Sequence, residues 1–193
     1  MQKLNKLHQS IMKGFTLVEL LIVVIILAIL AAIVIPQFTS STDDAKLSAL
    51  DSNLANIRAA IDLYYQQHGK YPGATVSSGG TCDSGTADTA GSSANTAAAF
   101  LAQLTRYTNA SGQACTGSGA NYKYGPYLKK DTLPANPITG KNTLTVVSTG
   151  TLGMVSSLTD GSGGWKFDTK TGQFIADDHR LVPPSTTEYY DGR

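Results

Sequence analysis

The hydrophobic pattern of the chain changes first near the N-terminus. Residues 15–35, FTLVELLIVVIILAILAAIVI, are apolar except for Thr16 and Glu19. As a helix this stretch is about 31 Å long, which matches the ~30 Å core of a bilayer. The 14 residues before it contain three lysines and no acidic residue, which holds that end in the cytoplasm. The pattern therefore predicts one membrane-spanning helix over residues 15–35.

A helical period of 3.6 residues follows this stretch. Apolar residues recur at steps of three and four and define one face of a helix. They are Leu47, Leu50, Leu54, Ile57, Ile61 and Tyr64. Four alanines lie off this face: Ala45, Ala49, Ala55 and Ala59. We expect an amphipathic helix over residues 36–69 whose apolar face holds a head domain, while the alanine face is either solvated or in contact with helices of other subunits.

Two residues mark the course of this helix. Pro36 lacks a backbone N–H and should kink the helix or melt it locally. Gly69 is expected just past the last turn, as the C′ residue. From Phe15 to Gln67 an unbroken helix would measure roughly 80 Å, which suggests a rod-like assembly.

Residues 70–193 are expected to form the globular head. In residues 73–99, 22 of 27 positions are Gly, Ala, Ser or Thr, which predicts a long flexible loop. Ala97 to Tyr107 predicts a short second helix with Phe100 facing inward. Residues 109–121 are expected to form another loop.

The strand signals come later in the chain. Residues 143–148 alternate and are β-branched, and the segments 165–168 and 173–176 flank a turn in which Gly172 is positioned for positive φ. Residues 151–158 are a weaker candidate strand. The fold class is therefore α+β: a long N-terminal stalk helix packed on a small antiparallel sheet of three or four strands, with a short second helix.

Composition narrows the function classes. The formal net charge is +1 and charged residues make up only 15% of the chain. The charge balance argues against a nucleic-acid protein, which needs a basic stripe, so no nucleic-acid contact is expected. The apolar run near the N-terminus argues against a plain cytoplasmic enzyme. No Ser, Cys or His stands in a catalytic motif, and we assign no catalytic residue.

The two cysteines, Cys82 and Cys115, both follow the membrane segment. A head on the far side of the membrane faces an oxidising compartment, so we expect a disulfide between them. It would tie the small-residue loop to the region after the second helix. The alternative is two free thiols.

Two residues at the start of the apolar run are unusual. Gly14 precedes the run, whereas the small-residue cleavage site of a secretory signal follows it. Cleavage after Gly14 would remove residues 1–14 and leave the membrane helix on the product. Glu19 lies inside the apolar layer, where a carboxylate needs a partner. The alternative is an interfacial acid that reaches the membrane surface or is protonated.

Residues 13–19, KGFTLVE, followed by an apolar run, resemble the class III signal of type IV pilins and type II secretion pseudopilins. The resemblance implies that a prepilin peptidase cuts after Gly14 and methylates the amine of Phe15. It implies that Glu19 pairs with the terminal amine of a neighbouring subunit during filament assembly. Pro36 matches a proline that these proteins carry at the corresponding position.

The head carries weaker similarities to the major pseudopilin. They are GKYP at 69–72, PYLKK at 126–130 and LPANP at 133–137. Asn136 stands where that family has Asp, and no Trp-Gly follows Pro137.

The same family binds calcium in a C-terminal loop, where this chain has Asp160, Asp177 and Asp178. These acids do not align residue by residue with the family motif. Calcium is therefore a candidate cofactor beside the alternative of a solvated acidic turn, and no other cofactor is expected.

The resemblance implies a subunit stored in the bacterial inner membrane, with the head extracytoplasmic, that polymerises into a periplasmic or surface filament. Its partners would be copies of itself, the prepilin peptidase, an inner-membrane assembly platform and minor pilins or pseudopilins. We favour a type II secretion pseudopilus. The alternative is a type IV pilus for adhesion, twitching or DNA uptake, and a remote alternative is a signal-anchored binding domain.

Overall fold

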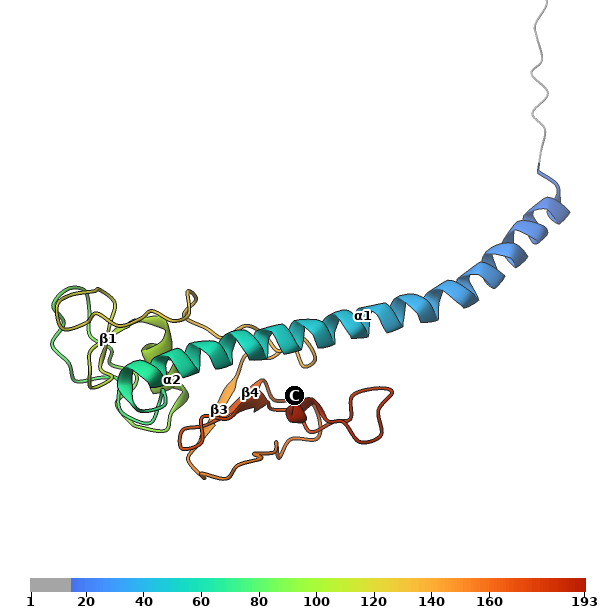
Figure 1. Cartoon of the computed structure of the whole chain (residues 1–193). Helices are drawn as coiled ribbons and strands as arrows, with labels where there is room; N and C mark the ends of the chain where they lie inside the picture. The colour runs from blue at the N-terminus through green and yellow to red at the C-terminus, as the bar shows by residue number, and fades with distance from the viewer. Residues whose placement is uncertain (1–14) are drawn as a thin grey trace, which may run out of the picture. The chain divides into compact units, whose positions relative to one another are not determined.

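The computed structural model describes residues 15–193, without the side chains of residues 35–40. The chain divides into two compact units, one up to Asp44 and the other from Ala45 to Arg193. Helix α1, Leu17–His68, contributes to both, and the second unit also contains α2, Ala97–Thr105, and all the strands. In Figure 1 the second half of α1 lies beside the strands labelled β3 and β4, with α2 near its C-terminal end.

The first half of α1 is apolar and exposed within the chain. The run Leu17–Val34 has a mean hydropathy of 3.3 and is long enough to cross a membrane. The helix continues through Pro36 without interruption, so the expected local melting does not occur. A proline removes one backbone donor, but its fixed φ is that of a helix. At the other end Gly69 has φ +65° and accommodates the left-handed C′ position, as predicted.

The second half of α1 buries the predicted face. Its residues Leu50, Leu54, Ile57, Ile61 and Tyr64 are each at most 2% exposed. They form one core with α2 and the sheet, to which those two elements contribute the large side chains Trp165, Phe100, Phe167 and Phe174. The four alanines off this face are exposed, and Leu47 at its start is half-buried. The amphipathic pattern is thereby confirmed.

Helix α2 is shorter than predicted. The hydroxyl of Thr96 caps it by accepting from the N–H of Ala99 at 3.2 Å, and the helix ends at Thr105. Tyr107 is not helical but belongs to β1, Tyr107–Thr108, which pairs antiparallel with β2, Ala114–Cys115. The region 109–121, predicted as a loop, therefore contains a short strand, because chain reversal brings these backbone groups within hydrogen-bonding distance of β1.

The main sheet has three strands in the order β3-β4-β5. They are Leu144–Val147, Trp165–Asp168 and Phe174–Ala176. The hairpin β4-β5 is antiparallel, as predicted, and Gly172 in its turn has φ +76°. However, β3 and β4 pair in parallel, so the sheet is mixed rather than antiparallel. The connection 148–164 crosses back before β4 starts, as parallel pairing requires. Residues 151–158 lie in this connection and form no strand.

The small-residue segment 73–99 is held by buried polar groups, contrary to the predicted flexible loop. The amide of Gln103 accepts from the N–H of Gly73 at 2.6 Å and donates to the carbonyl of Gly112 at 2.8 Å. The carboxylate of Asp88 accepts from the hydroxyl of Ser77 and pairs with Arg106 at 2.9 Å. All of these residues except Arg106 are buried. Buried polar groups need hydrogen-bond partners, and these groups have them.

Candidate functional site: the N-terminal helix and its head

Thr16 and Glu19, two residues of the segment that resembles the class III signal, cap the N-terminus of α1. The N–H and the hydroxyl of Thr16 both donate to Oε2 of Glu19, at 2.9 and 2.7 Å. The N–H of Glu19 donates back to the Thr16 hydroxyl at 3.2 Å. This is a capping box, in which the first free backbone donors of a helix are satisfied by side chains. The spacing T-x-x-E before an apolar run is the sequence signal for this capping box.

Glu19 thus has a partner within its own chain. Its carboxylate is bound on one side by Thr16, and Phe15 beside it is 79% exposed. In the described residues no basic side chain pairs with Glu19. Gly14 and the rest of the leader 1–14 lie outside the described residues, as does the side chain of Pro36. The roles of Gly14, Phe15, Glu19 and Pro36 in cleavage, methylation and assembly stay predictions.

Among residues 15–193, nothing covers the apolar surface of this helix. Its large side chains between Phe15 and Val34 are 43% to 81% exposed. An uninterrupted apolar surface of this kind does not persist in water and requires lipid or other apolar helices around it. This helix is therefore suited to lie in a membrane, to pack in a bundle of helices, or to do first one and then the other.

The disulfide was predicted correctly. Cys82 and Cys115 are bonded, with their Cα atoms 5.9 Å apart. Cys115 lies in β2 and is fully buried, and it also bridges Ala87 through the backbone. The bond therefore fastens the segment 73–99 to the small two-stranded sheet, in the oxidised form expected of an extracytoplasmic head.

The three acids suggested for calcium have protein partners. The two oxygens of Asp177 accept from the hydroxyls of Thr145 at 3.1 Å and Ser156 at 2.7 Å. Asp178 forms a two-pronged ion pair with Arg180, with a closest approach of 2.7 Å. Asp160 accepts from the N–H of Ser162 at 2.9 Å. Among the described residues, no group of three or more His, Cys, Asp or Glu side chains is arranged to hold a metal ion. Calcium stays a prediction from the resemblance.

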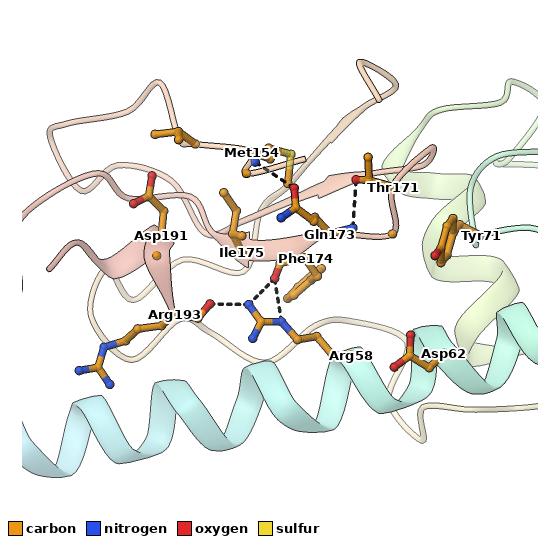
Figure 2. A pocket seen from close by; sticks show the side chains of 14 residues that line it. Arg58, Asp62, Tyr71, Met154, Thr171, Gln173, Phe174, Ile175, Asp191 and Arg193 are labelled. Atoms are coloured by element: carbon orange, nitrogen blue, oxygen red, sulfur yellow. Dashed lines mark hydrogen bonds between the residues drawn. The ribbon is translucent and has the colours of Figure 1, made fainter. Parts of the chain in front are cut away.

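An open pocket of about 510 Å³ lies between α1 and the C-terminal part of the head (Figure 2). Arg58 points from α1 to the edge of β5, where Nε and Nη2 donate to the carbonyl of Phe174 at 3.0 and 2.8 Å. Nη2 also donates to the carbonyl of Arg193. The Arg193 side chain pairs in turn with Asp51 at 2.7 Å and Glu188 at 2.8 Å. These contacts fasten the sheet edge and the C-terminal segment to the helix.

The sequence alone does not reveal this role of Arg58, because its partners are backbone carbonyls. A basic side chain on the half-buried border of an amphipathic helix is a weak signal, since most such residues are merely solvated. The contact depends on where β5 lies, which the helix sequence does not encode. The residues that line the pocket make hydrogen bonds and ion pairs that hold the fold together. None of these lining residues is a nucleophile with an adjacent base.

Aromatic rings gather where α1 ends. Tyr64 and His68 stack with their ring centres 4.0 Å apart, and Tyr124 and Tyr127 meet His68 edge-on. Burial lowers the pKa of His68, although the ring faces the carbonyls of Tyr64 and Asn109, which favour the charged form. Burial also raises the pKa of Tyr127 to about 12 and raises that of Tyr64. These groups stay neutral near pH 7 and act as packing rather than as acids or bases.

The geometry thus consists of an uncovered apolar helix with a capped start and a disulfide-bonded head. Comparison with known proteins finds similarity over part of the chain. Residues 10–35 match the family model of the prokaryotic N-terminal methylation motif. No solved structure matches the chain significantly.

Curated relatives fall in two groups. The type II secretion system core protein G of Pseudomonas aeruginosa is 46% identical over 59 residues, which are 31% of this chain and 42% of that protein. The fimbrial protein of Neisseria meningitidis serogroup B is 39% identical over 70 residues, 36% of this chain and 41% of that protein. A core protein G of Klebsiella pneumoniae is 33% identical over 60 residues, 31% of this chain and 43% of that protein.

The motif and these relatives show that about a third of the chain is similar to type IV pilins and type II secretion pseudopilins. The relatives are structural subunits and not enzymes. The chain spans about two fifths of the length of each relative. The N-terminal helix with its methylation motif fits a membrane-anchored pilin.

Proposed function

We propose that this protein is a structural subunit that waits in the bacterial inner membrane and polymerises into a filament through α1. The observation that carries the proposal is the uncovered apolar surface of Leu17–Val34, directly after a methylation motif. Lipid covers this surface in the stored subunit, and helices of other copies cover it in the filament. In both states the cost of exposing apolar side chains to water is avoided.

We further propose that the filament is a pseudopilus of a type II secretion system, a fibre that drives folded proteins outward. The similarity to a core protein G at 46% identity supports this, as do the GKYP and PYLKK segments of the head. The expected partners are the prepilin peptidase, an inner-membrane assembly platform and minor pseudopilins. The head would lie in the periplasm before assembly.

The second candidate is a type IV pilus, and specific observations favour it. The fimbrial protein of Neisseria meningitidis matches over a longer stretch, 70 residues. Asn136 replaces the acid of the pseudopilin motif, and it is fully buried with its amide donating to the carbonyl of Gly164 at 3.0 Å. Asn136 therefore serves the fold here, so this part of the head departs from the core protein G pattern.

Processing and assembly are tested together. Mass spectrometry of the mature protein should find a methylated Phe15 at the N-terminus, and Gly14→Val should leave the leader attached, because a side chain obstructs the scissile position. Electron microscopy of sheared surface material should show fibres that disappear when the gene is deleted. Intact Met1 in assembled fibres would reject the proposal.

The two machines are separated by their outputs. Deleting the gene should leave secreted enzymes in the periplasm if the fibre is a pseudopilus. The same deletion should abolish twitching or adhesion, with secretion unchanged, if it is a pilus.

A further inference from the structure

A second cleft, of about 470 Å³, lies on the head, away from the stalk pocket. Three chain segments far apart in the sequence form its walls. They contribute Thr81, the residues 109–113 around Asn109 and Gln113, and the run 120–124. Its lining contains no carboxylate and no thiol, and its polar groups are almost all amides, hydroxyls and phenols.

The walls are fixed by covalent and polar ties just behind the lining. The disulfide joins Cys82, next to Thr81, to Cys115, two residues after Gln113. The carboxylate of Asp83 accepts from the backbone N–H of Asn121 at 2.6 Å and from its side-chain amide at 2.8 Å. Hydrogen bonds to the carboxylate lower the pKa of Asp83, so these ties persist in mildly acidic solution. A cleft with walls held in this way loses little conformational entropy on binding.

Two of the amide side chains, Gln113 and Asn121, are bound at one end only. Asn109 accepts from the N–H groups of Ser111 and Gln113, both at 3.0 Å, and donates to Oε1 of Gln113 at 2.8 Å. This leaves the Nε2 group of Gln113 and the Oδ1 atom of Asn121 without a hydrogen-bond partner among the described residues. The bound ends fix the orientation of each amide, so the cleft presents oriented donors beside oriented acceptors.

An aromatic ring and one positive charge complete the cleft. Tyr124 is half-buried, and the Lys123 ammonium lies 5.4 Å from the centre of its ring. Tyr122 also lines the cleft and is otherwise buried. A Cβ at Gly80 would lie 2.0 Å from the Tyr122 hydroxyl, so a glycine is required there for the tyrosine to fit.

We propose that this cleft binds a saccharide. A sugar hydroxyl is donor and acceptor at once, and oriented amides match both roles. The C–H face of a pyranose ring is apolar and packs on an aromatic ring such as that of Tyr124. A cleft of a few hundred cubic ångströms with a few oriented polar groups is typical of small-ligand sites. The proposal is independent of which filament the protein builds.

The test uses the full chain in detergent. Saturation-transfer NMR is recorded with galactose, N-acetylglucosamine and N-acetylneuraminic acid as probes, at concentrations up to on the order of 10 mM, where weak sites bind. Ala110→Trp fills the cleft from an exposed position and removes no polar group. Ala135→Trp is the matched control, because Ala135 is also exposed but does not line the cleft.

We expect a transfer signal with at least one probe, reduced about tenfold by Ala110→Trp and unchanged by Ala135→Trp. Gln113→Glu, which keeps the acceptor for Asn109 and removes the free amide donor, should also weaken the signal. Thermal unfolding of each variant, compared with the wild type, shows that the head remains folded. The proposal is overturned if no probe gives a signal, or if the signal survives in Ala110→Trp. Neither outcome affects the proposed filament function, which is tested separately by electron microscopy of the fibres.

Discussion

Thr16 and Glu19 satisfy each other's polar groups at the start of α1, with a hydroxyl-to-carboxylate distance of 2.7 Å. A monomer therefore holds this carboxylate without help from another subunit. A terminal amine arriving from a neighbouring copy would add its charge to a carboxylate that is already positioned. Glu19 therefore has two distinct roles to test: it caps the start of α1 through Thr16, and it is predicted to pair with a neighbouring subunit during assembly.

Substitutions at the two positions distinguish these roles. Glu19→Val should leave membrane insertion and cleavage intact but lower filament yield by about tenfold or more, because a buried charge then lacks its partner. Thr16→Ala removes the cap and keeps the charge, so it should assemble nearly normally. Glu19→Gln should be intermediate. Fibre yield is measured against the processed monomer pool, and normal assembly by Glu19→Val would contradict the pairing role.

The disulfide should contribute to the stability of the head. Breaking the link between Cys82 and Cys115 should lower the free energy of unfolding by about 3–4 kcal/mol, because the unfolded chain gains freedom. Cys82→Ala and Cys115→Ala should cost similar amounts if the bond is the main term. Denaturant unfolding measures both variants. A much larger loss in Cys115→Ala alone would assign the effect to packing of its buried site. Protease sensitivity should rise within residues 73–99.

Gly172 is constrained by φ and by close packing. A Cβ there would lie 2.3 Å from the Tyr71 ring, and φ is +76°. Gly172→Ala should therefore destabilise the head by ~3 kcal/mol or more, through strain and steric overlap. Gly140→Ala is the matched control, since φ is +71° and no atom lies within 4 Å of the new Cβ. It should cost about 1 kcal/mol from backbone strain alone. Equal losses in the two variants would argue against the Tyr71 contact.

Arg58 should hold the sheet edge to the stalk. Arg58→Leu removes both donors to the Phe174 carbonyl and should cost about 2 kcal/mol, because a partly buried acceptor loses its partner. Arg58→Lys retains one donor and should cost less. Hydrogen exchange of the β5 amides measures the local effect. Unchanged protection in Arg58→Leu would show that packing alone holds this edge.

His68 should make the head less stable in mild acid. Burial lowers the pKa of His68 in the folded state, so the unfolded state binds the proton more readily. The free energy of unfolding should fall as the pH drops from about 6.5 towards the lowered folded pKa. Above pH 6.5 His68 is neutral in both states, so this destabilisation should be absent. His68→Gln should flatten the pH dependence in that window. Chemical denaturation at pH 7.5 and pH 5.5 measures the free energy of unfolding of the wild type and of the variant. If the free energy changes equally with pH in both proteins, the role of His68 is contradicted.

The sequence alone determined the features that depend on local patterns. The apolar run of residues 15–35, the buried face from Leu50 to Tyr64 and the Gly172 hairpin all follow from side-chain periodicity or a turn residue's φ. The disulfide also followed, because the chain has only two cysteines and both lie beyond the membrane segment. The helix and hairpin signals depend on residues close together in the sequence. The disulfide depends on a pairing for which the chain offers a single combination of cysteines.

Only the tertiary structure decided the features that depend on where distant segments meet. The parallel pairing of β3 with β4 depends on the path of residues 148–164, and strand composition carries no direction. The composition of segment 73–99 predicted a flexible loop, because small polar residues give no core signal, yet the buried carboxylate of Asp88 and the amide of Gln103 hold it. Arg58 acquired its partner only when β5 was laid along the helix. Hydrogen bonds between residues far apart in sequence are set by the assembled fold, so no local pattern predicts them.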